Sequence, residues 1–201
     1  RPEALTCPRP PGYGILRSGI KPYAACRDIH SSLDVILDAR SRHSLTPADI
    51  ASIEVCCIPE MMQMIGGVAF PKTRIEAQLH LPYSIAVALV AGKAFLAEFE
   101  PPLLNDPEVK RLVGLIRLIE SPDLPFDSEP YITLKTRDGR SITGHVEYAS
   151  GAPQNPLPPA KIIEKFETLA RRVLPRPEVN ELRDKVLALT SLADVREIAV
   201  C

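Results

Sequence analysis

The chain has 201 residues, of which 45% are hydrophobic and 24% charged, and its formal net charge is −1. This length supports one medium-sized domain with a core that needs no disulfide or metal to hold it. The near-neutral charge argues against binding to nucleic acid or to a membrane surface. The longest apolar run, residues 85–91, is far shorter than the roughly 18–20 residues that a membrane-spanning helix requires. We therefore expect neither nucleic acid nor membrane as a partner.

The cysteines point to a reducing compartment. There are five, an odd number without the spacing of a disulfide framework: Cys7, Cys26, Cys56, Cys57 and Cys201. This pattern predicts free thiols and a cytoplasmic protein. The chain starts at Arg1 and shows no signal-peptide pattern. Residues 1–14 are rich in proline and are typical of an interdomain linker, so we expect a piece of a longer protein with one domain over residues 15–201.

Hydrophobic periodicity predicts the elements of the first part of the chain. An apolar stripe with helical spacing predicts a helix over residues 25–42, and its members are Ile29, Leu33, Ile36 and Leu37. Alternation over residues 50–58 predicts a strand. The methionine-rich residues 61–64 are interpreted as a gap-filling or mobile segment.

A helix is predicted over residues 73–91. Thr73 and Glu76 have the spacing of a capping box at its start, and Gly92 provides a stop at its end. Pro82 lies inside this range. Because proline lacks a backbone N–H, we expect the helix to bend there and to leave backbone groups available for a ligand.

The remaining elements alternate irregularly between helices and strands. Asp138 and Gly139 are a strong hairpin signal between two strand-like runs. The predicted elements are a helix at 105–111, strands at 115–120, 131–137 and 141–148, helices at 159–173 and 178–189, and a short last helix after residue 191. This order predicts an α+β fold with a mainly antiparallel sheet covered by helices.

One cluster of chemically active side chains lies at the start of the first predicted helix. Cys26, His30 and Asp34 are spaced so that they share one helix face. Asp34 could orient the His30 imidazole, or Cys26 and His30 could form the nucleophile–base pair of a thiol hydrolase. A zinc site with Cys56 or Cys57 is weakly indicated, because neighbouring residues on a strand point to opposite faces. A buried cysteine and a structural histidine explain the same spacing equally well, and we expect no metal.

Lys21 and two residues near Pro82 complete the candidates. Lys21 precedes the first predicted helix, where a cation beside free backbone amides could bind an anion. His80 and Tyr83 lie beside the expected bend. A solvated lysine, a surface histidine and a core tyrosine are the alternatives.

Three runs in this order resemble the C-terminal domain of the MmgE/PrpD family, which includes 2-methylcitrate dehydratases, cis-aconitate decarboxylases and iminodisuccinate epimerases. The first run is matched by Gly19, Lys21, Pro22, Tyr23, Cys26, His30 and Asp34. The second is matched by Ala77, Gln78, Pro82, Tyr83, Ala86 and Gly92. The third is matched by Gly151, Pro153, Asn155 and Pro156, followed by Lys165 and Phe166.

The resemblance implies the smaller, lid-like domain of a two-domain enzyme that needs no metal or organic cofactor. The active site would lie between this domain and a helical N-terminal domain, and the protein would be a homodimer. By resemblance, Lys21, Tyr83 and His30 are expected to be catalytic, and Lys21, Cys26 and His80 to bind substrate. Cys26 occupies a position that is His in the decarboxylase branch, and His80 and Ala24 stand where Ser and Pro are usual.

The implied substrates are small di- or tricarboxylates. The expected activity is that of a cofactor-independent lyase or isomerase, with dehydration of a 2-methylcitrate-like substrate, as in bacterial propionate catabolism, favoured over decarboxylation and epimerisation. By itself the chain is expected to be inactive. The alternative from another class is a stand-alone, non-catalytic carboxylate-binding or interaction module.

Overall fold

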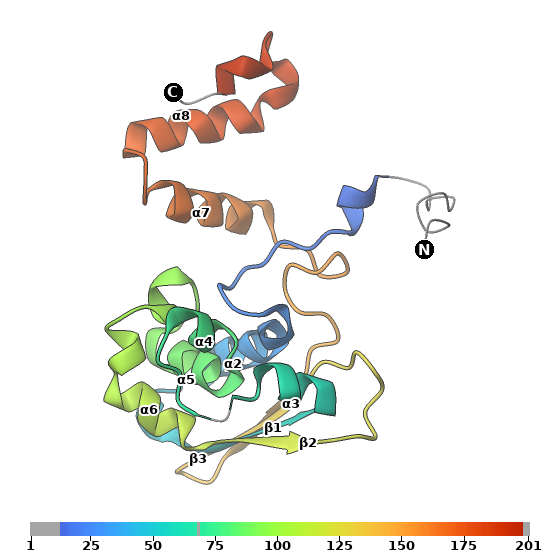
Figure 1. The fold of residues 1–201 in the computed structure, drawn as a ribbon, viewed down its shortest axis with the longest axis vertical. Helices are drawn as coiled ribbons and strands as arrows, with labels where there is room; N and C mark the ends of the chain where they lie inside the picture. Colours follow the sequence, from blue (N-terminus) through green and yellow to red (C-terminus); the bar gives the residue numbers. More distant parts are fainter. Residues whose placement is uncertain (1–12, 68, 199–201) are drawn as a thin grey trace. The chain divides into compact units, whose positions relative to one another are not determined.

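The computed structural model describes residues 13–67 and 69–198 (Figure 1). The chain forms two compact units with a boundary between Pro156 and Leu157. Most of the predicted linker, together with Cys7 and Cys201, lies outside the described residues. Among the described helices, none is long and apolar enough to cross a membrane.

The first unit contains one mixed sheet of four strands in the order β2-β1-β3-β4. The strands are β1 (Ile50–Cys57), β2 (Ile116–Glu120), β3 (Tyr131–Thr136) and β4 (Ser141–Gly144). β1 is parallel to β2, whereas the β1–β3 and β3–β4 pairs are antiparallel. The predicted α+β class with a mainly antiparallel sheet is therefore confirmed, although β4 ends earlier than expected.

The strand pattern of β1 explains its burial. Ile53, Val55 and Cys57 are fully buried, whereas Cys56 between them is partly exposed. This alternation is what a strand with one face on the core requires. The prediction that Cys56 and Cys57 point to opposite faces is confirmed.

Helices cover the sheet and build the core of the first unit (Figure 1). They are α2 (His30–Arg42), α3 (Pro59–Ile65), α4 (Arg74–Gln78), α5 (Leu81–Ala91) and α6 (Pro107–Val113). Helix α5 is buried from Leu81 to Leu89 and packs against α2 and α6. Short 3-10 turns connect these elements at Gly14–Arg17, Arg27–Ile29, Pro47–Asp49, Leu96–Phe99 and Leu103–Asn105.

The predicted helix over 25–42 begins later than expected. Helix α2 starts at His30, after the turn Arg27–Ile29. Cys26 has an extended backbone, and its N–H donates to the Gln78 carbonyl at 2.8 Å instead of joining a helix. With a ψ of 146°, Cys26 lies outside the helix and does not share it with His30 and Asp34.

The predicted helix over 73–91 is two helices, not one bent helix. The capping box of Thr73 and Glu76 and the left-handed Gly92 at the end are confirmed. Between them the chain leaves the helix at Leu79 and His80, and α5 starts anew with Pro82 in its first turn. Proline is favoured at this position because the missing N–H would be unpaired there anyway.

Two starts of short helices also differ from expectation. The methionine-rich segment is helix α3, and Met61 and Met62 fill space in and beside the core, as the gap-filling interpretation expects. Pro59 and Glu60 in its first turn are ordinary signals of a helix start. Helix α6 is capped by Asp106, whose carboxylate accepts hydrogen bonds from the Glu108 and Val109 N–H groups. The predicted hairpin at Asp138 and Gly139 is confirmed, with Gly139 in the left-handed region.

The second unit is helical, as predicted. It contains α7 (Pro159–Ala170) and α8 (Arg176–Leu187), followed by 3-10 turns at Leu189–Ser191 and Val195–Ile198. The Glu167 carboxylate of α7 contacts the Arg183 guanidinium of α8 at 2.7 Å.

Candidate functional site

Two of the predicted catalytic residues meet at one backbone oxygen. Lys21 is an exposed residue whose ammonium donates to the Ala25 carbonyl at 3.3 Å, and His30 Nε2 lies 3.3 Å from the same oxygen. A carbonyl only accepts, so the Nε2 atom must carry a proton to form this bond. The His30 ring is fully buried at the start of α2. The segment before α2 therefore brings an exposed cation close to a buried imidazole.

Tyr23 and Asp34 lie beside this pair; the sequence suggested a role for Asp34, as the group that orients His30, but none of its own for Tyr23. The Tyr23 hydroxyl donates to Asp34 Oδ1 at 2.6 Å, and the Tyr23 ring meets the His30 ring edge-on at 5.2 Å between centroids. Burial, and then the negative charge of Asp34, raise the pKa of Tyr23 far above its ordinary value. The hydroxyl therefore stays protonated and serves as a fixed donor. The sequence signal that could have identified Tyr23 was its place in the first family-like run.

The second carboxylate oxygen of Asp34 binds a residue outside helix α2. Oδ2 accepts a hydrogen bond from the Ser150 backbone N–H at 2.6 Å. The sequence suggested Asp34 as the group that orients His30. The structure instead places its two oxygens on Tyr23 and Ser150.

All three family-like runs come together around residues 19–34. The Ile20 N–H donates to the Gly151 carbonyl at 2.8 Å, and the Cys26 N–H donates to the Gln78 carbonyl at 2.8 Å. The first run is thus tied to the third and to the second. Motifs that are far apart in the sequence form one structural cluster.

Cys26 is half-buried with a free thiol on the segment between Lys21 and α2. Burial, followed by the influence of Cys56 and Glu120, raises the pKa of the Cys57 thiol to about 11, so Cys57 stays protonated. Over residues 13–67 and 69–198, no group of three or more His, Cys, Asp or Glu side chains is arranged to hold a metal.

Tyr83 lies in the core of the first unit. Its side chain is 0% exposed, and its hydroxyl donates to the Glu98 carbonyl at 2.8 Å. The rings of Phe70 and Phe99 flank it with centroids 5.9 Å away. Burial, with smaller effects of Asp106 and Glu98, raises the pKa of Tyr83. The catalytic role of Tyr83 stays a prediction, and the structure does not bring Tyr83 together with Lys21.

His80 caps helix α5 with both ring nitrogens engaged. Nδ1 accepts a hydrogen bond from the Tyr83 N–H at 3.0 Å, and Nε2 lies 3.1 Å from the Ala69 carbonyl. These partners require a neutral ring with its proton on Nε2. Burial lowers the pKa of His80 and favours this neutral form. The alternative of a surface histidine is wrong, because His80 is buried.

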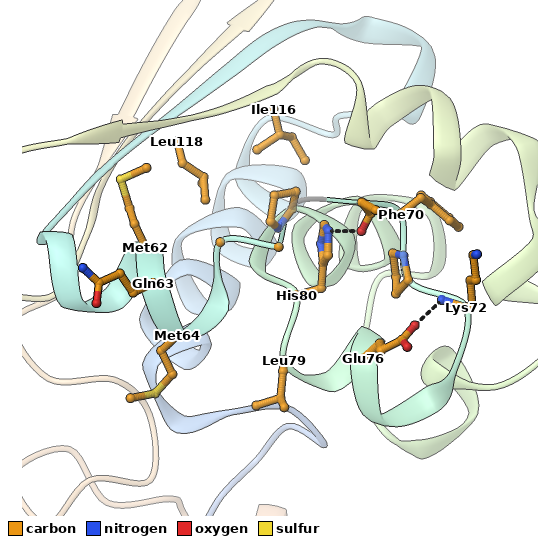
Figure 2. A pocket seen from close by; sticks show the side chains of 15 residues that line it. Met62, Gln63, Met64, Phe70, Lys72, Glu76, Leu79, His80, Ile116 and Leu118 are labelled. Atoms are coloured by element: carbon orange, nitrogen blue, oxygen red, sulfur yellow. Dashed lines mark hydrogen bonds between the residues drawn. The ribbon is translucent and has the colours of Figure 1, made fainter.

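A pocket of about 920 Å³ opens beside His80 (Figure 2). Figure 2 shows Met62 of α3 and Leu118 of β2 on one side and Phe70 and His80 on the other. Its lining is mostly apolar, with the polar ends of Gln63, Lys72 and Glu76 at the surface. Within the part of the chain that the structure describes, His80 is the predicted site residue that lines this pocket.

The buried cap predicts a pH-dependent stability. Because the folded-state pKa of His80 lies below its ordinary 6.5, the unfolded chain takes up a proton first as the pH falls. The stabilisation is complete above pH 6.5 and is lost as the pH falls through the folded-state value. The variant His80→Ser keeps an oxygen that can cap α5 and removes the titration. We expect its free energy of unfolding, measured by denaturant titration, to fall less than that of the unchanged protein between about pH 7.5 and about pH 5. Equal slopes would contradict this account.

Comparisons with known proteins identify a matching family and several similar proteins. A family model described as the MmgE/PrpD C-terminal domain matches residues 23–190. The chain is 28% identical over 189 residues to a cis-aconitate decarboxylase of Aspergillus terreus, covering 88% of this chain and 38% of that protein. It is 30% identical over 156 residues to the cis-aconitate decarboxylase of Mus musculus, covering 75% and 31%. It is 28% identical over 169 residues to the 2-methylcitrate dehydratase of Cupriavidus necator, covering 77% and 33%.

Proposed function

Because the chain belongs to the MmgE/PrpD family, through the C-terminal domain of that family, we propose that it is the C-terminal part of a lyase acting on a small di- or tricarboxylate. Its curated relatives bear the names of a decarboxylase and a dehydratase. The chain spans about two fifths or less of the length of these relatives. We therefore propose that a helical N-terminal domain of the same polypeptide supplies the rest of the active site.

The observation that supports this proposal best is the meeting of Lys21 and His30 at the Ala25 carbonyl. Lyases of this kind remove a proton, or carbon dioxide, next to a carboxyl group, and negative charge develops there in the transition state. An ammonium held beside that position stabilises the charge, and a nearby imidazole can move a proton. The exposed position of Lys21 leaves it able to reach a carboxylate of the substrate.

Dehydration of a 2-methylcitrate-like substrate is our first candidate. It is supported by the 2-methylcitrate dehydratase relative and by Cys26, since the decarboxylase branch has His at this position. Decarboxylation of cis-aconitate is the second candidate, because several similar proteins are named cis-aconitate decarboxylase.

The direct test is an assay of the full-length protein with 2-methylcitrate, citrate, cis-aconitate and iminodisuccinate. We expect water loss from 2-methylcitrate, which is measured by the ultraviolet absorbance of the new double bond. We expect no turnover by the 201-residue chain alone. Release of carbon dioxide from cis-aconitate would select the second candidate. Carboxylate binding without any turnover would favour the non-catalytic binding module.

The assembly and cellular conditions are further parts of the proposal. We propose a homodimer that needs no metal or organic cofactor and works in the cytoplasm. Light scattering of the full-length protein gives its mass, and turnover after dialysis against a chelator tests the metal independence. A monomer, or activity restored only by added metal, would contradict these parts.

A further inference from the structure

The third family-like run carries no side chain to which we assign a chemical role. It nevertheless contacts residues 20–26, the segment that carries Lys21. The Gly151 carbonyl accepts the Ile20 N–H at 2.8 Å, and the Gly151 N–H donates to the Asn155 carbonyl at 2.8 Å. The Asn155 side chain in turn donates to the Tyr148 carbonyl at 2.9 Å. The run is a turn braced by its own hydrogen bonds, and its inner edge faces the residue before Lys21.

Only glycine fits this contact. Gly151 has a φ of +84°, and a Cβ atom built on it would lie 1.9 Å from the Ile20 carbonyl oxygen. A Cβ atom on Gly19 would lie 2.7 Å from the Gly151 oxygen. The backbones of residues 19–20 and Gly151 therefore lie closer together than a Cβ atom on either glycine would allow. This close contact fixes one end of the Lys21 segment.

Asp34 holds the middle of this segment, at Tyr23. Its two oxygens bind the Tyr23 hydroxyl and the Ser150 N–H, each at 2.6 Å. Hydrogen bonds to a carboxylate are stronger than those between neutral groups. Tyr23 belongs to the Lys21 segment and Ser150 directly precedes Gly151, so a single carboxylate joins the segment to the turn that braces it.

We infer that Asp34 is a positioning residue, which holds residues 20–26 so that Lys21 and His30 meet at the Ala25 carbonyl. Asp34 acts through Tyr23 and Ser150. Its effect on turnover rests on the proposed function, whereas its effect on the order of the segment does not.

The first test compares Asp34→Ala with Asp34→Asn in the full-length protein. Asparagine can still accept from the Ser150 N–H and donate to the Tyr23 oxygen, because the hydroxyl can turn. We expect Asp34→Ala to lower kcat about 100-fold, the usual cost of misplacing a catalytic group by about 1 Å. Asp34→Asn should retain kcat within about threefold, because it restores the position without the charge. Equal loss in both variants would overturn the inference and indicate a direct role of the charge.

The second test does not depend on any substrate. Hydrogen exchange, followed by mass spectrometry of peptides that contain residues 19–26 and 148–156, should be at least about tenfold faster in Asp34→Ala. Unchanged exchange in these peptides would also overturn the inference. If exchange changes but the unchanged protein turns over no polycarboxylate, the proposed function fails while the positioning role stands.

Asp49→Ala is the matched control. Asp49 also accepts two hydrogen bonds, from the N–H and hydroxyl of Thr46 at 2.8 and 2.7 Å, but in the turn before β1. The Asp49→Ala variant should have lower stability, with kcat and the hydrogen exchange of the two peptides unchanged. A similar kcat loss in both variants would show that Asp34 contributes only general stability.

Discussion

Replacing Lys21 by Ala in the full-length protein is expected to lower kcat by about 10²- to 10³-fold, the cost of removing one group that stabilises developing negative charge. Lys21 is an exposed residue, and its ammonium is held beside His30 by a shared carbonyl. Because the interaction strengthens as charge develops, the loss should fall on kcat more than on KM. Steady-state kinetics with the substrate found in the panel measures both.

Two variants complete this experiment. Lys21→Arg keeps the charge but changes its shape and reach, so it should recover only part of the lost turnover. Lys135→Ala removes an exposed lysine from β3 and should leave kcat unchanged. Full turnover in Lys21→Ala would remove this residue from the mechanism.

Replacing Tyr83 by Ala is expected to destabilise the protein by about 3–5 kcal/mol, as for other buried aromatic side chains. The ring is fully buried between Phe70 and Phe99, and its loss would leave a cavity in the core. Denaturant unfolding followed by circular dichroism measures the change.

Tyr83→Phe separates the ring from the hydroxyl. It should cost only about 1–3 kcal/mol, because it leaves the Glu98 carbonyl without its buried partner. Turnover of this variant decides the predicted catalytic role. A folded Tyr83→Phe protein with nearly normal kcat would show that the hydroxyl is structural, whereas a large fall in kcat would support the prediction.

Much of the fold could be predicted because its signals are local. Alternation identified β1, the Asp138–Gly139 pair identified the β3–β4 hairpin, and the capping box identified the start of α4. The errors arose where distant residues decide the backbone. Cys26 is extended and its N–H is bound to Gln78, and no periodicity in residues 25–42 carries that information.

The site shows the same division between local and distant information. Sequence spacing placed Lys21 and His30 near each other, and the structure joins them at one oxygen. It could not assign Asp34 to Ser150, since the partners become neighbours only when the chain after β4 returns to the start of α2. Nor could it show that His80 caps α5 with Nδ1 while its Nε2 bonds to the Ala69 carbonyl.

The close backbone contact between Ile20 and Gly151 has a consequence for the order of folding. The two residues come from opposite ends of the first unit, so their contact closes a loop that contains all four strands. Closing such a long loop is slow compared with forming local helices and turns. The segment that carries Lys21 should therefore be set late in folding. A correctly placed Lys21 would therefore indicate that the sheet has formed.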